Sequence, residues 1–309
     1  MTTIRLPSPT GAAAASALRL CLLPAVTAAL VIVGLRFGPL GSASFTAACA
    51  LAIAVFGIPH GTLDIEIAAL RYGLVGRVDR LKIILSYVAC AAVTAGLWLA
   101  APELALCLFL FVSILHFSRD WLNAADPFLS LMVAWALVAT PALTRSAEVA
   151  IIFDTLTGNQ NGRIIADLLA CTSVPALLGC LTFTFWSFQN GEVRRAVELL
   201  TCLVATLFLP PLLAFAVFFC GLHSPRHMAD ALKETGALSR TKKIAIIAAV
   251  FLLSAAGGVM LLAGQGQVPV ETGIIRSAIM LISILTVPHF ILESFALTNR
   301  SANRPAHDL

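Results

Sequence analysis

The sequence predicts an all-α integral membrane protein, a polytopic helical bundle with eight to ten membrane spans. Of its 309 residues, 59% are hydrophobic and only 12% are charged, whereas soluble proteins carry about 25% charged residues. The apolar residues gather in runs of about 17 to 25 residues, a length that crosses the hydrocarbon layer as a helix. The alternating pattern of membrane barrel strands is not apparent. We therefore expect a bundle built from helices alone.

Charged connections, or connections that contain proline and glycine, separate nine apolar runs. These runs cover residues 18–35, 43–70, 82–100, 103–120, 128–143, 165–188, 197–224, 244–264 and 274–297. We expect a disordered tail at 1–16, a single transmembrane domain at 17–298 and a polar tail at 299–309. His307 falls in that last tail and is expected to be solvated.

Two basic connections, 71–82 and 226–243, determine the expected topology. Both should lie on the cytoplasmic side, because lysine and arginine favour that side. Five spans between them would put them on opposite sides, which one miscounted crossing within 128–195 would resolve. The candidates are a re-entrant run at 128–143 and an extra crossing formed with 147–157. We expect an even number of spans in the cell's inner (plasma) membrane, with both termini cytoplasmic.

The charge and cysteine content argue against two other classes of protein. The net charge of +4 is scattered over the connections, which is ordinary for membrane topology and does not indicate a nucleic-acid partner. The eight cysteines form no C-x-x-C motif and mostly sit in the middle of apolar runs. We interpret them as small packing groups, not as disulfides or a zinc site.

Four of the six histidines are followed, four residues later, by a group that can bind or orient a metal. The pairs are His60/Asp64, His116/Asp120, His223/His227 and His289/Glu293. On a helix, a spacing of four places both side chains on one face. Ionisable groups in apolar segments are costly and usually functional. The sequence therefore predicts a histidine-rich metal centre inside the membrane.

His223 and His227 give the strongest local signal. An H-x-x-x-H pair on one helical turn brings two neutral imidazoles together without backbone strain. The alternative is a helix end with two interfacial histidines, because Pro225 lies between them and could begin or kink the helix. His60 stands in a stretch with proline and glycine on either side, and such irregular backbone at membrane depth needs support from protein or a cavity.

His116 and His289 carry less specific signals. His116 lies near the end of an apolar run, and only the presence of the other histidines favours a ligand role for it. His289 could be a ligand, a substrate-pocket residue or a packed core histidine. Asp64, Asp120 and Glu293 could bind the metal directly or accept hydrogen bonds from ring N–H groups, which fixes tautomer and ring orientation; we expect the latter.

Four ordered stretches carry these residues. They are Gly57-Ile-Pro-His-Gly-Thr-Leu-Asp64, Ser113-Ile-Leu-His-Phe117, Pro210-Pro-Leu-Leu-Ala-Phe through Phe219-Cys-Gly-Leu-His-Ser-Pro-Arg-His227, and Leu285-Thr-Val-Pro-His-Phe-Ile-Leu292. In this order they resemble the Brp/Blh family of membrane-bound bacterial and archaeal β-carotene 15,15′-dioxygenases, over residues 45 to 297.

The resemblance implies an Fe²⁺ enzyme that splits β-carotene at its central double bond with O2 and yields two molecules of all-trans retinal. It implies that four histidines bind the iron: His60, His116, His223 and His227. Its P-H motif matches His289, which we expect beside the ligands or in the substrate pocket. No catalytic residue beyond the metal ligands is implied. β-Carotene would enter sideways from the lipid bilayer, and an opsin could receive the retinal.

Two other functions remain open. A membrane metal or proton transporter would use intramembrane histidines and acids as a pathway, although such proteins tend to show related halves that are not visible here. A lipid-modifying oxygenase acting on another apolar polyene would use a similar site. Imidazole ligands alone do not choose the metal, but O2 chemistry beside an apolar pocket favours iron.

Overall fold

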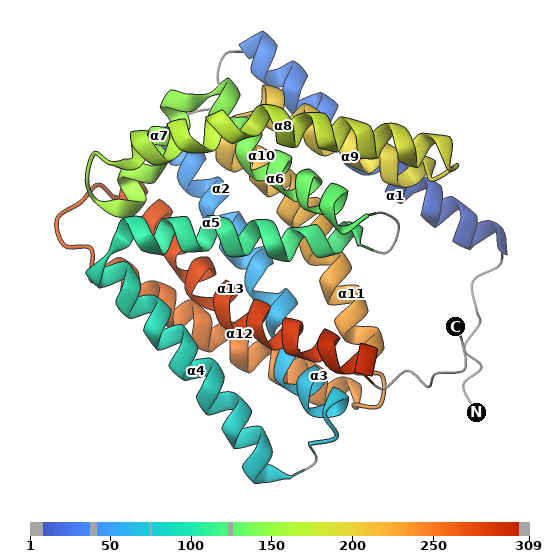
Figure 1. Ribbon diagram of the computed structural model, residues 1–309. Helices are drawn as coiled ribbons and strands as arrows, with labels where there is room; N and C mark the ends of the chain where they lie inside the picture. The colour runs from blue at the N-terminus through green and yellow to red at the C-terminus, as the bar shows by residue number, and fades with distance from the viewer. Residues whose placement is uncertain (1–8, 38–41, 75, 123–125, 303–309) are drawn as a thin grey trace.

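The computed structural model describes residues 9–37, 42–74, 76–122 and 126–302, and within these ranges every regular element is a helix. The first half holds α1 (Pro9–Phe37), α2 (Ala43–Gly57), η1 (Ile58–Gly61), α3 (Asp64–Arg71), α4 (Arg77–Ala100), α5 (Pro102–Ser118), η2 (Arg119–Trp121) and α6 (Pro127–Thr144). The second half holds α7 (Ser146–Thr157), α8 (Gly162–Gln189), α9 (Val193–Phe208), α10 (Pro211–Phe218), η3 (Phe219–His223), α11 (Ser224–Glu234), α12 (Arg240–Ala263) and α13 (Val270–Ala302). The all-α prediction is confirmed (Figure 1).

The helices at both ends of the chain extend into the predicted tails. Helix α1 begins at Pro9, inside the tail expected at 1–16, because the run of alanines that follows has the highest helix propensity of any residue. Helix α13 continues to Ala302, past the boundary expected at 298. His307 lies outside the described residues.

Seven described segments are long and apolar enough to cross a membrane. They are Ala43–Arg71, Arg77–Ala100, Pro102–Trp121, Pro127–Thr144, Gly162–Gln189, Arg240–Ala263 and Val270–Ser294. The described apolar part of α1, Cys21–Gly34, is shorter. The count is lower than the predicted eight to ten, partly because the run expected as one span at 197–224 is divided between α9 and α10.

The division lies at Leu209 and Pro210, whose backbones are extended. Each of these residues precedes a proline, which disfavours the helical conformation. Helix α10 packs against α9, and Figure 1 shows α10 and α11 entering the bundle at an angle to α9. The additional helix therefore arises at this break.

The places expected for a miscounted crossing were wrong. Residues 127–144 form the full-length helix α6, not a short re-entrant run. Helix α7 has 12 residues, about 18 Å at 1.5 Å per residue, which is too short to span alone. The extra helical segment begins at the double proline, where α10, η3 and α11 follow one another without a gap from Pro211 to Glu234. It does not come from residues 128–195.

Ion pairs bring the two basic connections together at one end of the bundle. Arg71, at the end of α3, pairs with Glu234 at the end of α11. Glu66 pairs with Arg80 at 2.7 Å and with Lys242 at 3.6 Å. The prediction that 71–82 and 226–243 share a side agrees with these contacts.

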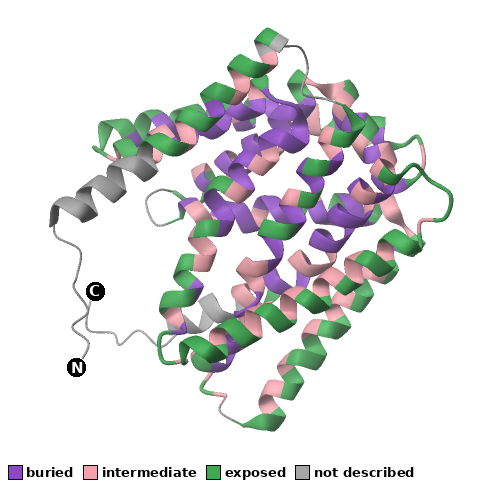
Figure 2. Ribbon diagram, turned by 180° about the vertical axis from the view of Figure 1, so that it is seen from behind, coloured by how far each residue is buried: buried purple, intermediate pink, exposed green. Residues whose placement is uncertain are grey.

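The most buried helices lie at the centre of the molecule, and the exposed ones surround them (Figure 2). Helices α2, α5, α6, α10 and α13 supply most of the buried apolar side chains. No residue of α12 is buried, and α4 buries only Thr94 and Trp98. Such apolar, unburied helices have surfaces suited to lipid.

Candidate metal centre

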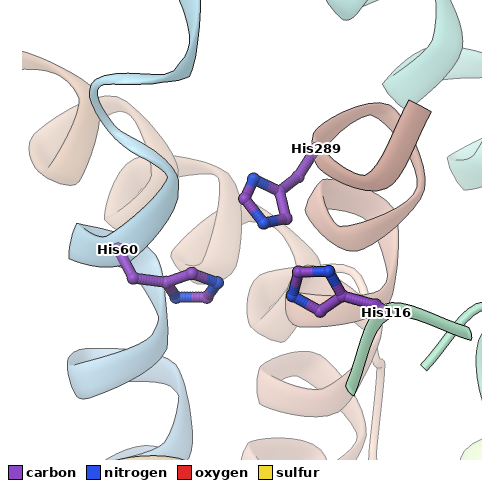
Figure 3. A group of neighbouring side chains, drawn as sticks. All are labelled: His60, His116 and His289. Carbon is purple, nitrogen blue, oxygen red and sulfur yellow. The ribbon is translucent and has the colours of Figure 1, made fainter. Parts of the chain in front are cut away.

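Five histidines from five helical segments converge at the centre of the bundle. They are His60 on η1, His116 on α5, His223 on η3, His227 on α11 and His289 on α13. The ring centroids of His116 lie 4.8 Å from those of both His223 and His289, and the His60 ring lies 5.1 Å from His289. Figure 3 shows the rings of His60, His116 and His289 turned toward one another. Segments far apart in sequence therefore supply one cluster.

Two irregular helical pieces, η1 and η3, position the rings of His60 and His223. His60 lies in the short 3-10 segment η1, where the Thr62 hydroxyl donates to the Pro59 carbonyl at 2.7 Å. His223 ends the π-helical segment η3, and π-helical turns occur frequently at functional sites. Pro225 occupies the first turn of α11, where its missing N–H needs no partner. The helix therefore continues through Pro225, and His227 stays beside His223, with ring centroids 4.4 Å apart.

Carboxylates form hydrogen bonds with these rings, and each of these bonds joins two different helical segments. Asp64 accepts from Nδ1 of His289 at 2.5 Å. Asp120 lies 2.8 Å from Nδ1 of His223 and 3.3 Å from Nε2 of His227.

The third carboxylate belongs to Glu293, which lies 3.1 Å from Nδ1 of His116. Arg119 donates to the same Glu293 carboxylate at 2.9 Å, and its guanidinium lies 4.3 Å from the ring centre of Phe290. A carboxylate that accepts from a ring N–H sets the tautomer and raises the basicity of the other nitrogen.

The pairing differs from the simplest reading of the i, i+4 spacing. Each acid follows one histidine by four residues, but its hydrogen bond goes to the ring of a histidine from a distant part of the chain. Neighbours on one helical face point in the same direction, so both reach the cluster side by side. The ring that faces the carboxylate then comes from across the cluster.

With these hydrogen bonds in place, the other nitrogen of a ring carries a lone pair that accepts no hydrogen bond. Nε2 of His116 and Nε2 of His223 face each other at 3.1 Å, while both Nδ1 atoms are occupied by carboxylates. A neutral imidazole with Nδ1–H has only a lone pair on Nε2, so two such atoms repel unless a cation lies between them. Nε2 of His289 and Nδ1 of His60 are buried and have no hydrogen-bond partner among the described residues.

The donor set fits a metal ion. Nitrogen atoms of His60, His116 and His289 lie within 4.8 Å of one another, and so do those of His116, His223 and His227. The two groups share His116. Imidazole suits iron, zinc and copper alike. All four histidines expected as ligands are in the cluster, and His289, which was expected beside it, joins them.

Two cavities of opposite character meet at the cluster. A polar vestibule of about 640 Å³ reaches His60, His227 and His289 and is lined by nine charged residues. These are Asp64, Arg71, Arg119, Asp120, Arg226, Asp230, Lys233, Glu234 and Glu293. An apolar cavity of about 390 Å³ reaches His60 and His289 from the side of α4 and α12.

Sequence reasoning missed Arg119 and left open whether the aromatic rings around His223 line the site or face lipid. The ring of Phe117 lies 4.8 Å from His223, and the ring of Phe219 stacks on it at 5.4 Å. Arg119 stands at the end of an apolar run, where arginine is ordinary, so nothing in the sequence marks its contact with Glu293. The phenylalanines are adjacent to ligand motifs, but composition alone does not separate them from lipid-facing rings.

Fold and site together define a helical membrane protein with a histidine cluster suited to a metal and open to an apolar cavity. A family model described as "Beta-carotene 15,15'-dioxygenase" matches residues 51–296, and the chain belongs to this family. The "Beta-carotene 15,15'-dioxygenase" of uncultured marine bacterium 66A03 is 30% identical over 264 residues, which cover 82% of this chain and 95% of that protein. No solved structure gives a significant match. The resemblance drawn from the four motifs is confirmed, and membership favours an enzyme over a transporter.

Proposed function

We propose that this protein cleaves β-carotene at its central 15,15′ double bond with O2, uses Fe²⁺ held by the histidine cluster, and releases two molecules of all-trans retinal. One C=C bond breaks, and each of its carbons gains one oxygen atom of O2. The observation that carries the proposal is the convergence of five imidazoles, with unpartnered nitrogens, at the end of an apolar cavity. Membership in the family supports the choice of substrate. The bilayer of the inner membrane is the proposed location and the source of the substrate.

The residues of the chain would divide the work between holding the metal and excluding water. His60, His116, His223 and His227 would bind the iron, and we add His289 because its Nε2 lies in the same cluster without a hydrogen-bond partner among the described residues. Bound Fe²⁺ supplies the redox chemistry that activates O2. Asp64, Asp120 and Glu293 would keep the rings oriented, through Nδ1 of His289, His223 and His116 and through Nε2 of His227.

Phenylalanines close the side of the cluster around His223. The rings of Phe117, Phe218 and Phe219 lie within 6 Å of the His223 ring. Apolar walls of this kind exclude water, which protects a reactive intermediate from side reactions. No group is needed as a general base, because the reaction removes no proton from the polyene.

The direct test is product formation by purified protein supplied with Fe²⁺, O2 and β-carotene. Retinal should appear, identified by chromatography, and metal analysis should find near one iron per chain. His223→Ala should lose both the iron and the product, whereas His307→Ala should change neither. A His223→Ala protein that keeps iron and full activity would refute the ligand assignment. A folded, iron-loaded wild-type protein without product would refute the reaction.

A further inference from the structure

The apolar cavity opens toward the flank of the bundle formed by α4 and α12. Its walls come from η1 and the neighbouring ends of α2 and α3, and from α4, α12 and α13. At its outer edge, Val88 of α4 is 57% exposed and Leu253 of α12 is 73% exposed. Because α12 buries none of its residues and α4 buries few, this flank faces the hydrocarbon when the protein is in a bilayer. We name this apolar cavity the lipid-side cavity.

The lipid-side cavity offers an apolar ligand almost no unsatisfied polar group. The described residues that line it include no aspartate, glutamate, lysine or arginine, and two of them are histidines. The hydroxyl of Thr286 donates to the Ile282 carbonyl at 2.7 Å, and that of Tyr87 donates to the Leu285 carbonyl at 3.3 Å. Pockets with polar groups already satisfied bind ligands by apolar burial. A hydrocarbon chain fits these walls better than a ligand that needs hydrogen bonds.

The inner end of the lipid-side cavity has the opposite chemistry. It ends at His60 and His289, whose Nδ1 and Nε2 atoms, respectively, are buried and unpartnered among the described residues. On the other side of the same rings lies the charged vestibule. An ion or water reaches the centre through the vestibule at less cost than through hydrocarbon, and a hydrocarbon chain has the reverse preference. The two routes therefore sort polar and apolar reactants.

We propose that the lipid-side cavity is the binding site for one half of a long apolar polyene, which enters between α4 and α12 from the hydrocarbon layer and presents a double bond at His60 and His289. This inference rests on the proposed cleavage of β-carotene. One half of the molecule occupies this cavity because the bond that is cut stands at its inner end. Ala91 on α4 and Ser254 on α12 both line the cavity. Because their side chains are small, they leave room for the ligand.

Tryptophan at either small residue narrows the cavity and tests the inference. Ser254→Trp and Ala91→Trp should keep iron but lower kcat/KM for β-carotene on the order of 10- to 100-fold, because small misplacements of a bound substrate have effects of this size. The matched controls are Leu252→Trp and Val93→Trp on the same two helices, 66% and 73% exposed and outside the cavity lining. Both should behave as wild type.

Anaerobic binding of β-carotene to the iron-loaded protein provides a readout that does not depend on cleavage. The Ser254→Trp and Ala91→Trp proteins should retain less β-carotene than their controls. Where a tryptophan variant loses iron, the leucine variant of the same residue replaces it in the comparison. Weaker binding in the variants would support the assignment of the cavity as the polyene site, even if the wild-type protein formed no retinal. The absence of retinal would refute only the proposed function.

Two outcomes would overturn the inference while leaving the reaction intact. The first is wild-type binding and cleavage in both cavity variants. The second is a normal Ser254→Trp protein together with strongly reduced cleavage in Leu122→Trp, since Leu122 lines the charged vestibule. The second outcome would place the polyene in the vestibule.

Discussion

At the scale of single residues, the site depends on three acids whose hydrogen bonds link one helical segment to another. Asp120 is the most heavily used, because its two oxygens face His223 and His227. The sequence places each acid near a histidine and predicts an orienting role, but it does not show which ring each acid meets. That choice depends on how the helices pack, which spacing along one helix does not contain.

Asp120→Asn should weaken metal binding while leaving the fold intact. The amide keeps the shape of the carboxylate but loses its charge and one acceptor, so the rings of His223 and His227 are less well oriented. We expect a loss of about 10- to 100-fold in metal affinity, measured by metal titration of the purified protein. Asp167→Asn is the control, because Asp167 pairs with Arg163 on the exposed side of α8. Equal affinities in the two variants would exclude the orienting role of Asp120.

His289→Ala separates a ligand from a pocket residue. As a ligand held by Asp64, His289 should be needed for iron retention, and its alanine variant should bind iron more weakly than wild type. Metal analysis after purification measures this directly. Full iron content with lost cleavage would place His289 in the substrate pocket and would remove it from the ligand set.

At the scale of elements, close packing between α2, η3 and α13 fixes where His223 stands. A Cβ atom added at Gly57 would lie 2.7 Å from Cε1 of Phe219 and 2.8 Å from Cδ1 of Ile282. Phe219 is buried and stacks on the rings of Phe215 and His223, so it has little room to move. Small residues at such contacts allow membrane helices to approach closely.

Gly57→Ala should therefore destabilise the protein and disturb the metal site together. Overpacking of this kind costs about 1 to 3 kcal/mol, and the displaced Phe219 ring would push on His223. Thermal unfolding and metal affinity in detergent measure the two effects. Gly96→Ala is the matched control on α4, where no described atom lies within 4 Å of the added Cβ; it should be neutral or stabilising by up to about 1 kcal/mol. A Gly57→Ala protein as stable as Gly96→Ala would contradict this packing account.

The elements also show where sequence reasoning reached its limit. Apolar length predicted most of the long helices within a few residues, since each must cross about 30 Å of hydrocarbon. The run 197–224 was expected as one span, but two extended residues, Leu209 and Pro210, divide it into α9 and α10. A bend and a reversal have the same local signal, and the contacts between α9 and α10 that distinguish them are tertiary.

At the scale of the whole molecule, the histidines lie between a charged end and an apolar flank. The ion pairs of Glu66 with Arg80 and Lys242, and of Arg71 with Glu234, gather the basic connections at the end of the bundle onto which the vestibule opens. The positive-inside rule predicts that this end is cytoplasmic. The protein would then draw a lipid-soluble substrate from the membrane and exchange polar species with the cytoplasm.

Epitope insertions test this orientation. An epitope placed at Gly73 and one placed at Gly236 should both be reached only after the membrane is permeabilised, because their connections share the cytoplasmic side. An insertion at Gly266, between α12 and α13, should be reached in intact spheroplasts, since α12 separates it from Gly236. Antibody labelling of each insertion gives the result, and labelling of Gly73 and Gly236 from opposite sides would refute the shared end.

X-ray absorption spectroscopy of the iron-loaded wild-type protein tests the account most directly, because it counts the imidazoles bound to the metal. An iron centre held by the histidine cluster should give a nitrogen shell with the multiple-scattering pattern of four or five imidazoles, reduced by one in the His223→Ala protein if that variant is loaded at high iron. A shell of sulfur atoms, or one dominated by carboxylate oxygens with fewer than three imidazoles, would contradict a metal centre built from these histidines.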